Sequence, residues 1–388
     1  MQLLLRYSFK NIFTKKLTSL LTVFGFGLVV FVFSAVLMLS HGLEQTLVDT
    51  GSDDNVVIIR KGSQTEVQSI IYRDMANDIK SEQSIAVGED GKQLITSEIL
   101  VLINQPKRIS DDPSNIAVRG VSEMSRTLRP KFKILEGRMW QPGTSEIIAG
   151  KKITGEFKGC GVGETVKFGQ RDWTVVGTFE TGGGGFESEL WGDVDQLMDA
   201  FGRPVFSSLT FKINDLNKFD EVKKRLESDP RLTIDVDLEK EYYRKQSTLM
   251  TTFISILGIT ISLIFSLGAI VGAMITMYAS VANRTVEIGT LRALGFRRKV
   301  VLVTFLIEAL MIAFIGGSLG ILCAFLLNSF EFSTTNWATF AELAFSFRMS
   351  TDIVVSSYIF ALAMGILGGF LPAVRASRLR IINALRAK

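Results

Sequence analysis

The sequence has few of the residues from which catalytic and metal sites are most often built. Its 388 residues include one histidine, His41, and two cysteines, Cys160 and Cys323. One histidine leaves no His/Cys cluster for zinc and almost no base for a serine or cysteine nucleophile. No G-x-x-x-x-G-K-[ST] stretch is present, so no P-loop is predicted. Paired carboxylates remain open as acid–base groups, but no pattern points to them, and we expect neither enzymatic chemistry nor a bound metal on this chain.

The two cysteines and the histidine fall in regions of different character. Cys160 lies in a polar region, Cys323 in an apolar stretch, and His41 at the end of another. We therefore expect no structural disulfide, and we interpret His41 as an amphipathic anchor at a membrane surface.

Charged side chains are almost missing from four long apolar stretches. Residues 17–43, 246–283 and 353–374 contain no Asp, Glu, Lys or Arg, and residues 300–330 contain only Glu308. Each stretch reaches the roughly 20 apolar residues that cross a ~30 Å hydrocarbon core. The sequence therefore predicts four membrane-spanning helices.

Basic residues collect in the short segments beside these stretches. Segments 1–16, 283–299 and 375–388 together hold 14 Lys/Arg and one acid, Glu287. The positive-inside rule places both termini and the middle segment in the cytoplasm. Residues 44–247, with 28 Lys/Arg and 34 Asp/Glu, then lie on the other side. We interpret these short basic segments as setting the orientation of the chain in the membrane and contacting lipid headgroups. We therefore expect no nucleic-acid binding.

Residues 44–247 have the pattern of a mixed α+β domain. Residues 125–200 are rich in short β-type runs and interrupt two βαβ-like halves, so we expect an inserted β-rich subdomain. The run Gly182–Gly185 is interpreted as a flexible loop. Predicted strands lie at residues 55–60, 93–103, 115–120, 131–135, 146–149, 164–167, 173–179, 208–213 and 232–236, and predicted helices at 67–82 and 218–228.

The second apolar stretch belongs to a longer helical pattern. Residues 238–283 contain no proline, and one continuous helix over them would be ~69 Å long, about twice the membrane thickness. Its first part, about 237–247, would project from the membrane as a stalk. A break near residues 247–251 is the alternative.

A short amphipathic helix is predicted between the second and third spans. Residues 284–294 have helical character, we expect Val286, Leu291 and Leu294 on one side, and Gly295 can end the helix. Such a helix either lies on the membrane surface or docks into a groove of a cytoplasmic ATPase.

Three stretches together resemble a known family. VEIGTLRALGF (286–296), FLIEALMIAFIGGSLG (305–320) and LPAVRASRL with ALRA (371–387) resemble the FtsX-like, MacB-type permeases of ABC transporters, also called type VII or mechanotransmission transporters. The resemblance implies a fold of four transmembrane helices and an extracytoplasmic α+β domain, Porter-like with an inserted Sabre-like subdomain. It also implies a coupling helix whose ATPase-coupling residues are Arg284, Val286, Glu287, Leu291, Leu294 and Gly295.

The resemblance also implies partners. It predicts a dimer of permeases, either two copies or a copy with a paralogue, bound to ABC ATPase subunits that carry ATP and Mg²⁺. Because this chain begins almost at the membrane, we expect the ATPase on a separate polypeptide. Export through a periplasmic adaptor and an outer-membrane channel, from a bacterial inner membrane, is the expected function. Lipoprotein release of the Lol type, FtsX-like signalling to cell-wall hydrolases, and a membrane-anchored receptor or enzyme are the alternatives.

Polar and small residues inside the third span suggest contacts with neighbouring helices. Glu308 is an ionisable group in an apolar stretch, so it marks a functional contact between helices or, alternatively, a hydrogen bond at a helix end. Gly316, Gly317 and Gly320 form a small-residue face for close packing, with a dimer interface as one place for it.

The predicted organisation of the chain is, in order, a cytoplasmic amphipathic helix (1–16), helix 1 (17–43), the extracytoplasmic domain with helical stalks (44–247), helix 2 (248–282), the coupling helix (283–299), helix 3 (300–329), an external loop (330–352), helix 4 (353–374) and a cytoplasmic tail (375–388).

Overall fold

The computed structural model describes residues 16–381, and these form two compact units. The first, here called the helical unit, comprises the described residues up to Gly42 together with Thr252–Phe330 and those from Phe347 on. The second, here called the α/β domain, comprises Leu43–Thr251 and Glu331–Ser346. The amphipathic helix predicted for residues 1–16 and the end of the cytoplasmic tail lie outside the described residues.

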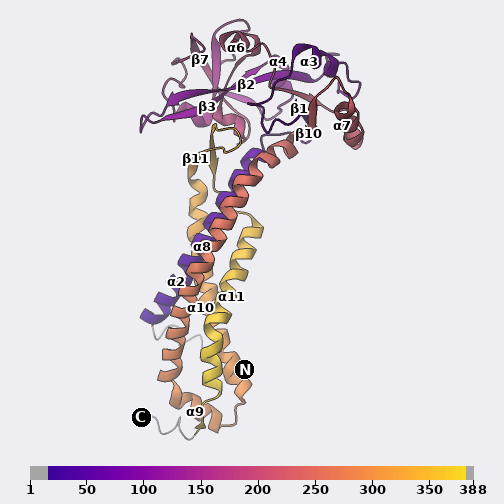
Figure 1. Ribbon diagram of the computed structural model, residues 1–388. Coiled ribbons are helices and arrows are strands. Elements are labelled where there is room, and N and C mark those ends of the chain that lie inside the picture. Colours follow the sequence, from indigo (N-terminus) through magenta and orange to yellow (C-terminus); the bar gives the residue numbers. More distant parts are fainter. Residues whose placement is uncertain (1–15, 382–388) are drawn as a thin grey trace. The chain divides into compact units, whose positions relative to one another are not determined.

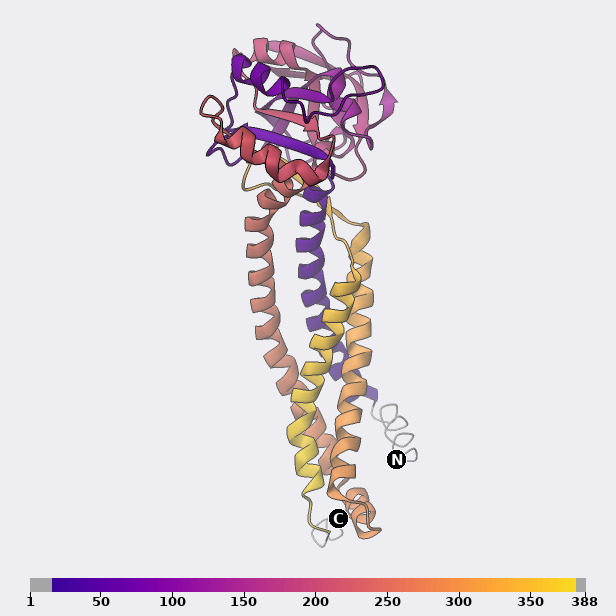
Figure 2. The same cartoon turned by 90° about the vertical axis from the view of Figure 1, so that its right-hand side faces the viewer.

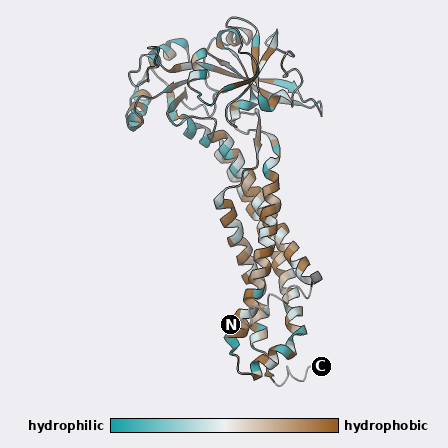
Figure 3. Cartoon of the chain, turned by 180° about the vertical axis from the view of Figure 1, so that it is seen from behind, coloured by the Kyte–Doolittle hydropathy of each residue, from teal (hydrophilic) through white to brown (hydrophobic). Residues whose placement is uncertain are grey.

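Four helices are long and apolar enough to cross a membrane. Within the helical unit they run side by side in both ribbon views (Figures 1 and 2), and most of their residues are apolar (Figure 3). The four helices are α2 (Lys16–Val48), α8 (Glu239–Asn283), α10 (Arg298–Leu326) and α11 (Thr351–Ser377). The short helix α9 (Thr285–Ala293) lies between α8 and α10, and a 3₁₀ turn, η3 (Leu327–Ser329), follows α10.

Two of these helices are longer than their apolar stretches. α2 continues to Val48, and α8 is one unbroken helix of 45 residues from Glu239 to Asn283. The break near residues 247–251 that the sequence left open is therefore absent. No proline interrupts α8, and its backbone hydrogen bonds run on through the polar first turns.

One mixed sheet of ten strands forms the centre of the α/β domain. Its order is β10-β1-β9-β2-β3-β8-β5-β7-β4, and β6 pairs with β7. The strands are β1 (Asn55–Arg60), β2 (Ile95–Pro106), β3 (Pro113–Val121), β4 (Lys133–Gly137), β5 (Glu146–Gly150), β6 (Thr165–Phe168), β7 (Arg171–Glu180), β8 (Glu189–Asp193), β9 (Ser208–Lys212) and β10 (Ile234–Leu238).

Short helices cover this sheet and complete its apolar core. Val56 and Ile58 of β1, Phe211 of β9 and Trp173 of β7 are fully or almost fully buried in that core. The helices are α3 (Arg73–Lys80), α4 (Glu123–Thr127), α5 (Lys151–Thr154), α6 (Val194–Ala200) and α7 (Phe219–Ser228), with 3₁₀ turns η1 (Gly185–Ser188) and η2 (Leu216–Lys218).

The inserted segment 125–200 does not form a layer of its own. Its strand β8 pairs in parallel with β3, with Val118 beside Leu190 and Gly120 beside Gly192. Through β8 the strands β5, β7 and β4 continue the ladder that β1, β2 and β9 begin. The segment is an insertion in sequence, but backbone pairing makes it the second half of one sheet.

Two loops of the sequence prediction have defined structure. Residues 330–352, expected as an external loop, contain the hairpin β11 (Glu331–Thr335) and β12 (Glu342–Ser346). The glycine run also does not fit a flexible loop. A Cβ on Gly184 would lie 3.0 Å from Cα of Thr50, so absence of a side chain permits close packing there.

Candidate functional site: the α9 turn and a buried ionic network

The α9 turn, residues 284–296, is closed by a glycine in the left-handed region. Gly295 has φ of 95°, which a residue with a Cβ adopts only with strain. Its N–H donates to the carbonyl oxygen of Arg292 at 3.2 Å, and the N–H of Phe296 donates to that of Leu291 at 3.2 Å. This pair of bonds is a Schellman motif, so Gly295 fixes where α9 stops and α10 begins.

The apolar residues of α9 divide between two faces. Val286 is 46% exposed and Leu294 72% exposed, whereas Ile288 is buried. Leu291 is half-buried and lines a small pocket with Phe296. Val286 and Leu294 are therefore the exposed members of the predicted set, and Leu291 is partly covered. Leu291 lies five positions after Val286, which is about 140° around a helix.

Arg284 and Glu308 meet in a buried ion pair. Arg284 stands between α8 and α9, and Glu308 lies on α10. The Arg284 Nη1 donates to Glu308 Oε2 at 2.9 Å and Nη2 donates to Oε1 at 3.2 Å. Their side chains are 9% and 5% exposed. Removing one partner of a buried ion pair is strongly destabilising, at a typical cost of roughly 3–5 kcal/mol.

Glycines allow α10 to touch two other helices of the same chain. A Cβ on Gly320 would lie 2.4 Å from the carbonyl oxygen of Gly27 on α2, and one on Gly316 would lie 2.7 Å from that of Val23. Gly317 faces Ala361 of α11. These small-residue faces therefore serve packing within the chain, in place of the dimer interface considered from sequence.

Polar hydroxyl pairs also join the long helices. Ser34 of α2 and Ser357 of α11 are hydrogen-bonded at 2.8 Å, and both side chains are buried. Thr22 of α2 donates to Thr276 of α8 at 3.1 Å.

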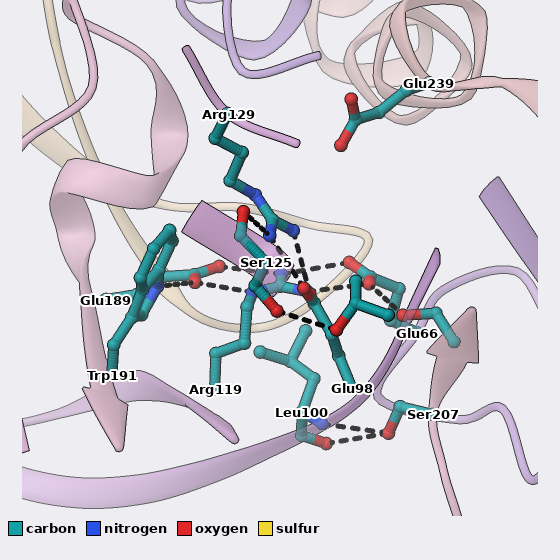
Figure 4. Close-up of polar contacts among 12 residues, drawn as sticks. Glu66, Glu98, Leu100, Arg119, Ser125, Arg129, Glu189, Trp191, Ser207 and Glu239 are labelled. Atoms are coloured by element: carbon teal, nitrogen blue, oxygen red, sulfur yellow. Dashed lines mark hydrogen bonds and ion pairs between the residues drawn. The ribbon is translucent and has the colours of Figure 1, made fainter. Parts of the chain in front are cut away.

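A buried ionic network occupies the α/β domain, centred on Arg119 of β3 (Figure 4). The Arg119 guanidinium donates to both oxygens of Glu66 at 2.8 and 3.0 Å and to both oxygens of Glu189 at 2.9 and 2.8 Å. It also reaches Glu98 at 3.0 Å. Arg129 adds a second fork to Glu98, at 2.7 and 2.8 Å. Arg119 and Glu98 are at most 1% exposed, so these charges are almost free of solvent screening.

Aromatic rings enclose the two guanidinium groups. The ring of Phe186 lies 5.0 Å from the guanidinium carbon of Arg119 and 4.5 Å from that of Arg129. Trp191 lies 5.3 Å from Arg129 and donates its Nε1–H to Glu189 at 2.8 Å. Such faces attract cations and exclude water.

Acids outnumber arginines in this network, and the pKa values divide accordingly. Burial raises the pKa of Glu98, but Arg129 and Arg119 outweigh it and hold that pKa below its ordinary value. For Glu189 and Glu239 burial is the larger effect, and their pKa values are raised despite the nearby arginines. The same buried region therefore favours the charged form of Glu98 and the protonated forms of Glu189 and Glu239.

The network includes the first residue of α8. Glu239 Oε2 accepts hydrogen bonds from the backbone N–H of Ser52 at 2.8 Å and from Asn55 Nδ2 at 2.9 Å. One turn later the hydroxyl of Tyr242 accepts from the backbone N–H of Glu66 at 2.9 Å. The start of α8 is thereby bonded to the sheet and to the segment that follows α2.

The segment after α2 is held in the same region. Thr50 Oγ1 accepts from the N–H of Gly185 at 2.6 Å. A Cβ on Gly51 would lie 2.7 Å from the backbone nitrogen of Lys240. The residues that follow α2 and those that begin α8 are therefore in direct backbone contact.

The β11–β12 hairpin is bonded to the sheet by charged groups. Glu342 accepts from Lys107 and from Ser114, and Lys107 also donates to Glu156 at 2.9 Å. Burial lowers the pKa of Lys107, but Glu342 and Glu156 outweigh it and raise that pKa above its ordinary value. The N–H of Ala344 donates to Ser188 Oγ at 3.1 Å.

Sequence reasoning selected the α9 turn but missed the network. A signal existed, because Arg119 interrupts a run of apolar strand residues and Glu98 directly precedes another, and a charged residue inside a buried strand needs a partner. Within residues 16–381 no three His, Cys, Asp or Glu side chains are grouped to hold a metal. Cys160 is buried, which raises the pKa of its thiol to about 12.

Comparison with known proteins gives this architecture a family. The family described as MacB-like periplasmic core domain matches residues 19–229, and the one described as FtsX-like permease C-terminal matches residues 248–381. The first alone covers more than half of the chain. The chain therefore belongs to the MacB/FtsX type of ABC transporter permeases.

Individual relatives agree with this assignment. The chain is 27% identical over 375 residues to the macrolide export ATP-binding/permease protein MacB of Shewanella sp. (strain W3-18-1), covering 85% of this chain and 55% of that protein. It is 26% identical over 414 residues to the uncharacterized ABC transporter permease YknZ of Bacillus subtilis (strain 168), covering 98% of each. The chain thus spans about half the length of the MacB relative and nearly all of YknZ.

One solved structure is also similar to part of the chain. It is the extracellular domain of the ABC-type transporter YknZ from Gram-positive bacteria. It covers 47% of this chain and 99% of that domain, with 14% sequence identity and a TM-score of 0.35.

Proposed function

We propose that this permease converts ATP binding and hydrolysis on a partner ATPase into movement of its α/β domain. The observation that carries the proposal is the course of α8. This single helix begins at Glu239, whose carboxylate belongs to the buried network, and ends at Asn283, one residue before Arg284. A hydrogen-bonded helix resists compression and bending, so displacement of the α9 turn is passed along α8.

The exposed face of α9 is the proposed docking surface for the ATPase. Val286 on α9 and Leu294, which directly follows the last residue of α9, are exposed apolar residues. The exposed residues Arg297, Arg298 and Lys299 come next. ATP and Mg²⁺ would be held by the ATPase, because the 388 residues contain no P-loop. The surplus of basic residues around α9 supports a cytoplasmic location for this turn and for both termini.

The partners on the opposite side of the membrane decide the physiological role. Our proposal is export from a bacterial inner membrane, by a dimer of permeases that works with a periplasmic adaptor and an outer-membrane channel. A lipoprotein carrier would instead indicate lipoprotein release, and a cell-wall hydrolase would indicate transmembrane signalling.

The test is purification of the tagged full chain from its own membranes in mild detergent, followed by mass spectrometry and an ATPase assay. We expect an ABC ATPase with the native chain and its loss, by about tenfold or more, with Leu294→Asp on the docking face. Leu135→Asp, at a 51% exposed position of β4, is the matched control and should retain the ATPase. Absence of an ATPase from the native preparation would overturn the proposal.

A further inference from the structure

We propose that Arg284 and Glu308 form the joint through which movement of α9 reaches α10. Both act as positioning residues, and the inference rests on the proposed function, because it assumes that an ATPase moves α9. Peptide continuity already connects α9 to α8. The ion pair adds a connection to a helix that lies beyond the α9–α10 turn.

The geometry of the pair suits the transfer of movement. Arg284 is the residue between the last residue of α8 and the first of α9, and Glu308 lies ten residues inside α10. Two parallel N–H···O bonds, at 2.9 and 3.2 Å, fix orientation as well as distance. A shift of the α9 start therefore displaces Glu308 along with it.

The surroundings of the pair are mostly apolar. Arg284 and Glu308 line a pocket with Ile288, Val301 and Phe305, all three of which are buried. Two polar residues, Glu287 and Thr304, also line it. For simple cohesion, apolar side chains of similar volume would serve as well as a buried ion pair. The pair adds a directional link that packing alone does not give.

α10 carries the movement onward by close backbone contact. Gly316 and Gly320 pack against α2, where a Cβ on Gly320 would lie 2.4 Å from the carbonyl oxygen of Gly27. At its other end α10 is followed by the β11–β12 hairpin, whose Glu342 is bonded to Lys107 and Ser114 of the sheet. The route from α9 through Glu308 thus ends at the hairpin, whereas the route along α8 ends at Glu239.

The decisive variant removes both charges together. Arg284→Met with Glu308→Gln removes both charges of this ion pair, so the double variant should fold better than either single change. The exchanged pair, Arg284→Glu with Glu308→Arg, tests whether the ion pair itself is needed. Ser34→Ala with Ser357→Ala is the matched control, since it removes a buried polar link between α2 and α11 that does not involve α9.

The measurement is hydrogen–deuterium exchange of the full chain, purified with its ATPase into nanodiscs, without nucleotide and with ATP plus orthovanadate. In the native complex we expect nucleotide-dependent exchange in residues 331–346 and in residues 239–247. In the neutral double variant the response of 331–346 should fall by about fivefold or more, while the response of 239–247 and the co-purified ATPase persist. The exchanged pair should restore the response of 331–346, and the serine variant should keep it.

Each contrary result has its own meaning. An unchanged response of 331–346 in the neutral double variant would overturn the joint and leave the proposed function standing. Loss of the ATPase from the neutral double variant would also overturn the joint and leave the proposed function standing, because the ion pair would then only shape the docking surface. An exchanged pair that folds but does not restore the response would show that the ion pair is not the link. A native chain that carries no ATPase would overturn both proposals.

Discussion

The carboxyl groups of the buried network outnumber its guanidinium groups, and this imbalance has an energetic consequence. Full ionisation would leave negative charge in excess in a region that excludes water, which is costly. The pKa values of Glu189 and Glu239 are raised, so these are the carboxyl groups whose charged forms the excess disfavours. The acids are Glu66, Glu98, Glu189 and Glu239, and the bases are Arg119 and Arg129.

We predict that Glu239→Gln stabilises the α/β domain at neutral pH. Burial raises the pKa of Glu239, so the folded chain holds this proton to a higher pH than the unfolded chain does. Stability is therefore lost as pH rises above the ordinary value of 4.5 through the raised pKa. Gln still offers one oxygen to Ser52 and Asn55, and its NH₂ replaces an oxygen that has no hydrogen-bond partner.

Thermal unfolding of the full chain, followed by tryptophan fluorescence, measures this effect. We expect a Tm higher by about 2–4 °C at pH 7.5, corresponding to about 1 kcal/mol, and a smaller difference at pH 4.5. An equal or lower Tm at pH 7.5 would show that Glu239 is a net stabilising charge.

Single residues were predicted from sequence better than their partners. Arg284 and Glu308 were each selected, one for coupling and one as an intramembrane acid, but nothing in a linear sequence joins residues 24 positions apart. Arg119 is 53 positions from Glu66 and 70 from Glu189. Which acid faces which base depends on strand order and register, and β3 pairs with β8, which lies near the end of the inserted segment 125–200.

At the scale of elements, local signals determined what could be predicted. The predicted strand 55–60 coincides with β1 because a bounded apolar run is a local property. The helix predicted at 67–82 is only Arg73–Lys80, since tertiary contacts decide where weak helices end. The single sheet was not predicted, because the sequence of a strand does not indicate which distant strand it pairs with.

Close helix packing gives a testable prediction at this scale. Gly320→Val should separate α2 from α10, because its Cβ would lie 2.4 Å from the Gly27 carbonyl oxygen. We expect a loss of at least about 1–3 kcal/mol in stability, measured as a lower Tm and a lower folded yield in detergent. Gly268→Ala on α8, where a Cβ meets nothing within 4 Å, is the matched control and should match the native chain. If the two variants behave alike, the contact between α2 and α10 is not tight.

At the scale of the whole molecule, the continuity of α8 is the feature that the proposed function needs most. Thr248 is exposed on this helix, so a substitution there alters the backbone and little else. We predict that Thr248→Pro leaves the ATPase bound and removes most of the nucleotide-dependent exchange in residues 239–247. Proline costs about 3 kcal/mol inside a helix and removes one of its hydrogen bonds.

Thr248→Ala is the control, and it should respond like the native chain. If Thr248→Pro responds like Thr248→Ala, α8 does not carry the movement. The neutral Arg284→Met with Glu308→Gln variant should reduce the response of residues 331–346, whereas Thr248→Pro should reduce that of residues 239–247. The two sets of variants thereby separate two routes through one chain.

The β11–β12 hairpin sets an order of events during biosynthesis. Translation makes the sheet residues first, and Lys107 and Ser114 leave the ribosome long before Glu342, which follows α8, α9 and α10. Because residues 331–346 belong to the α/β domain, this domain can be completed only after they have been synthesised. We therefore expect a chain that ends before Glu331 to have an incomplete α/β domain, because it lacks Glu342 and the bonds of Glu342 to Lys107 and Ser114.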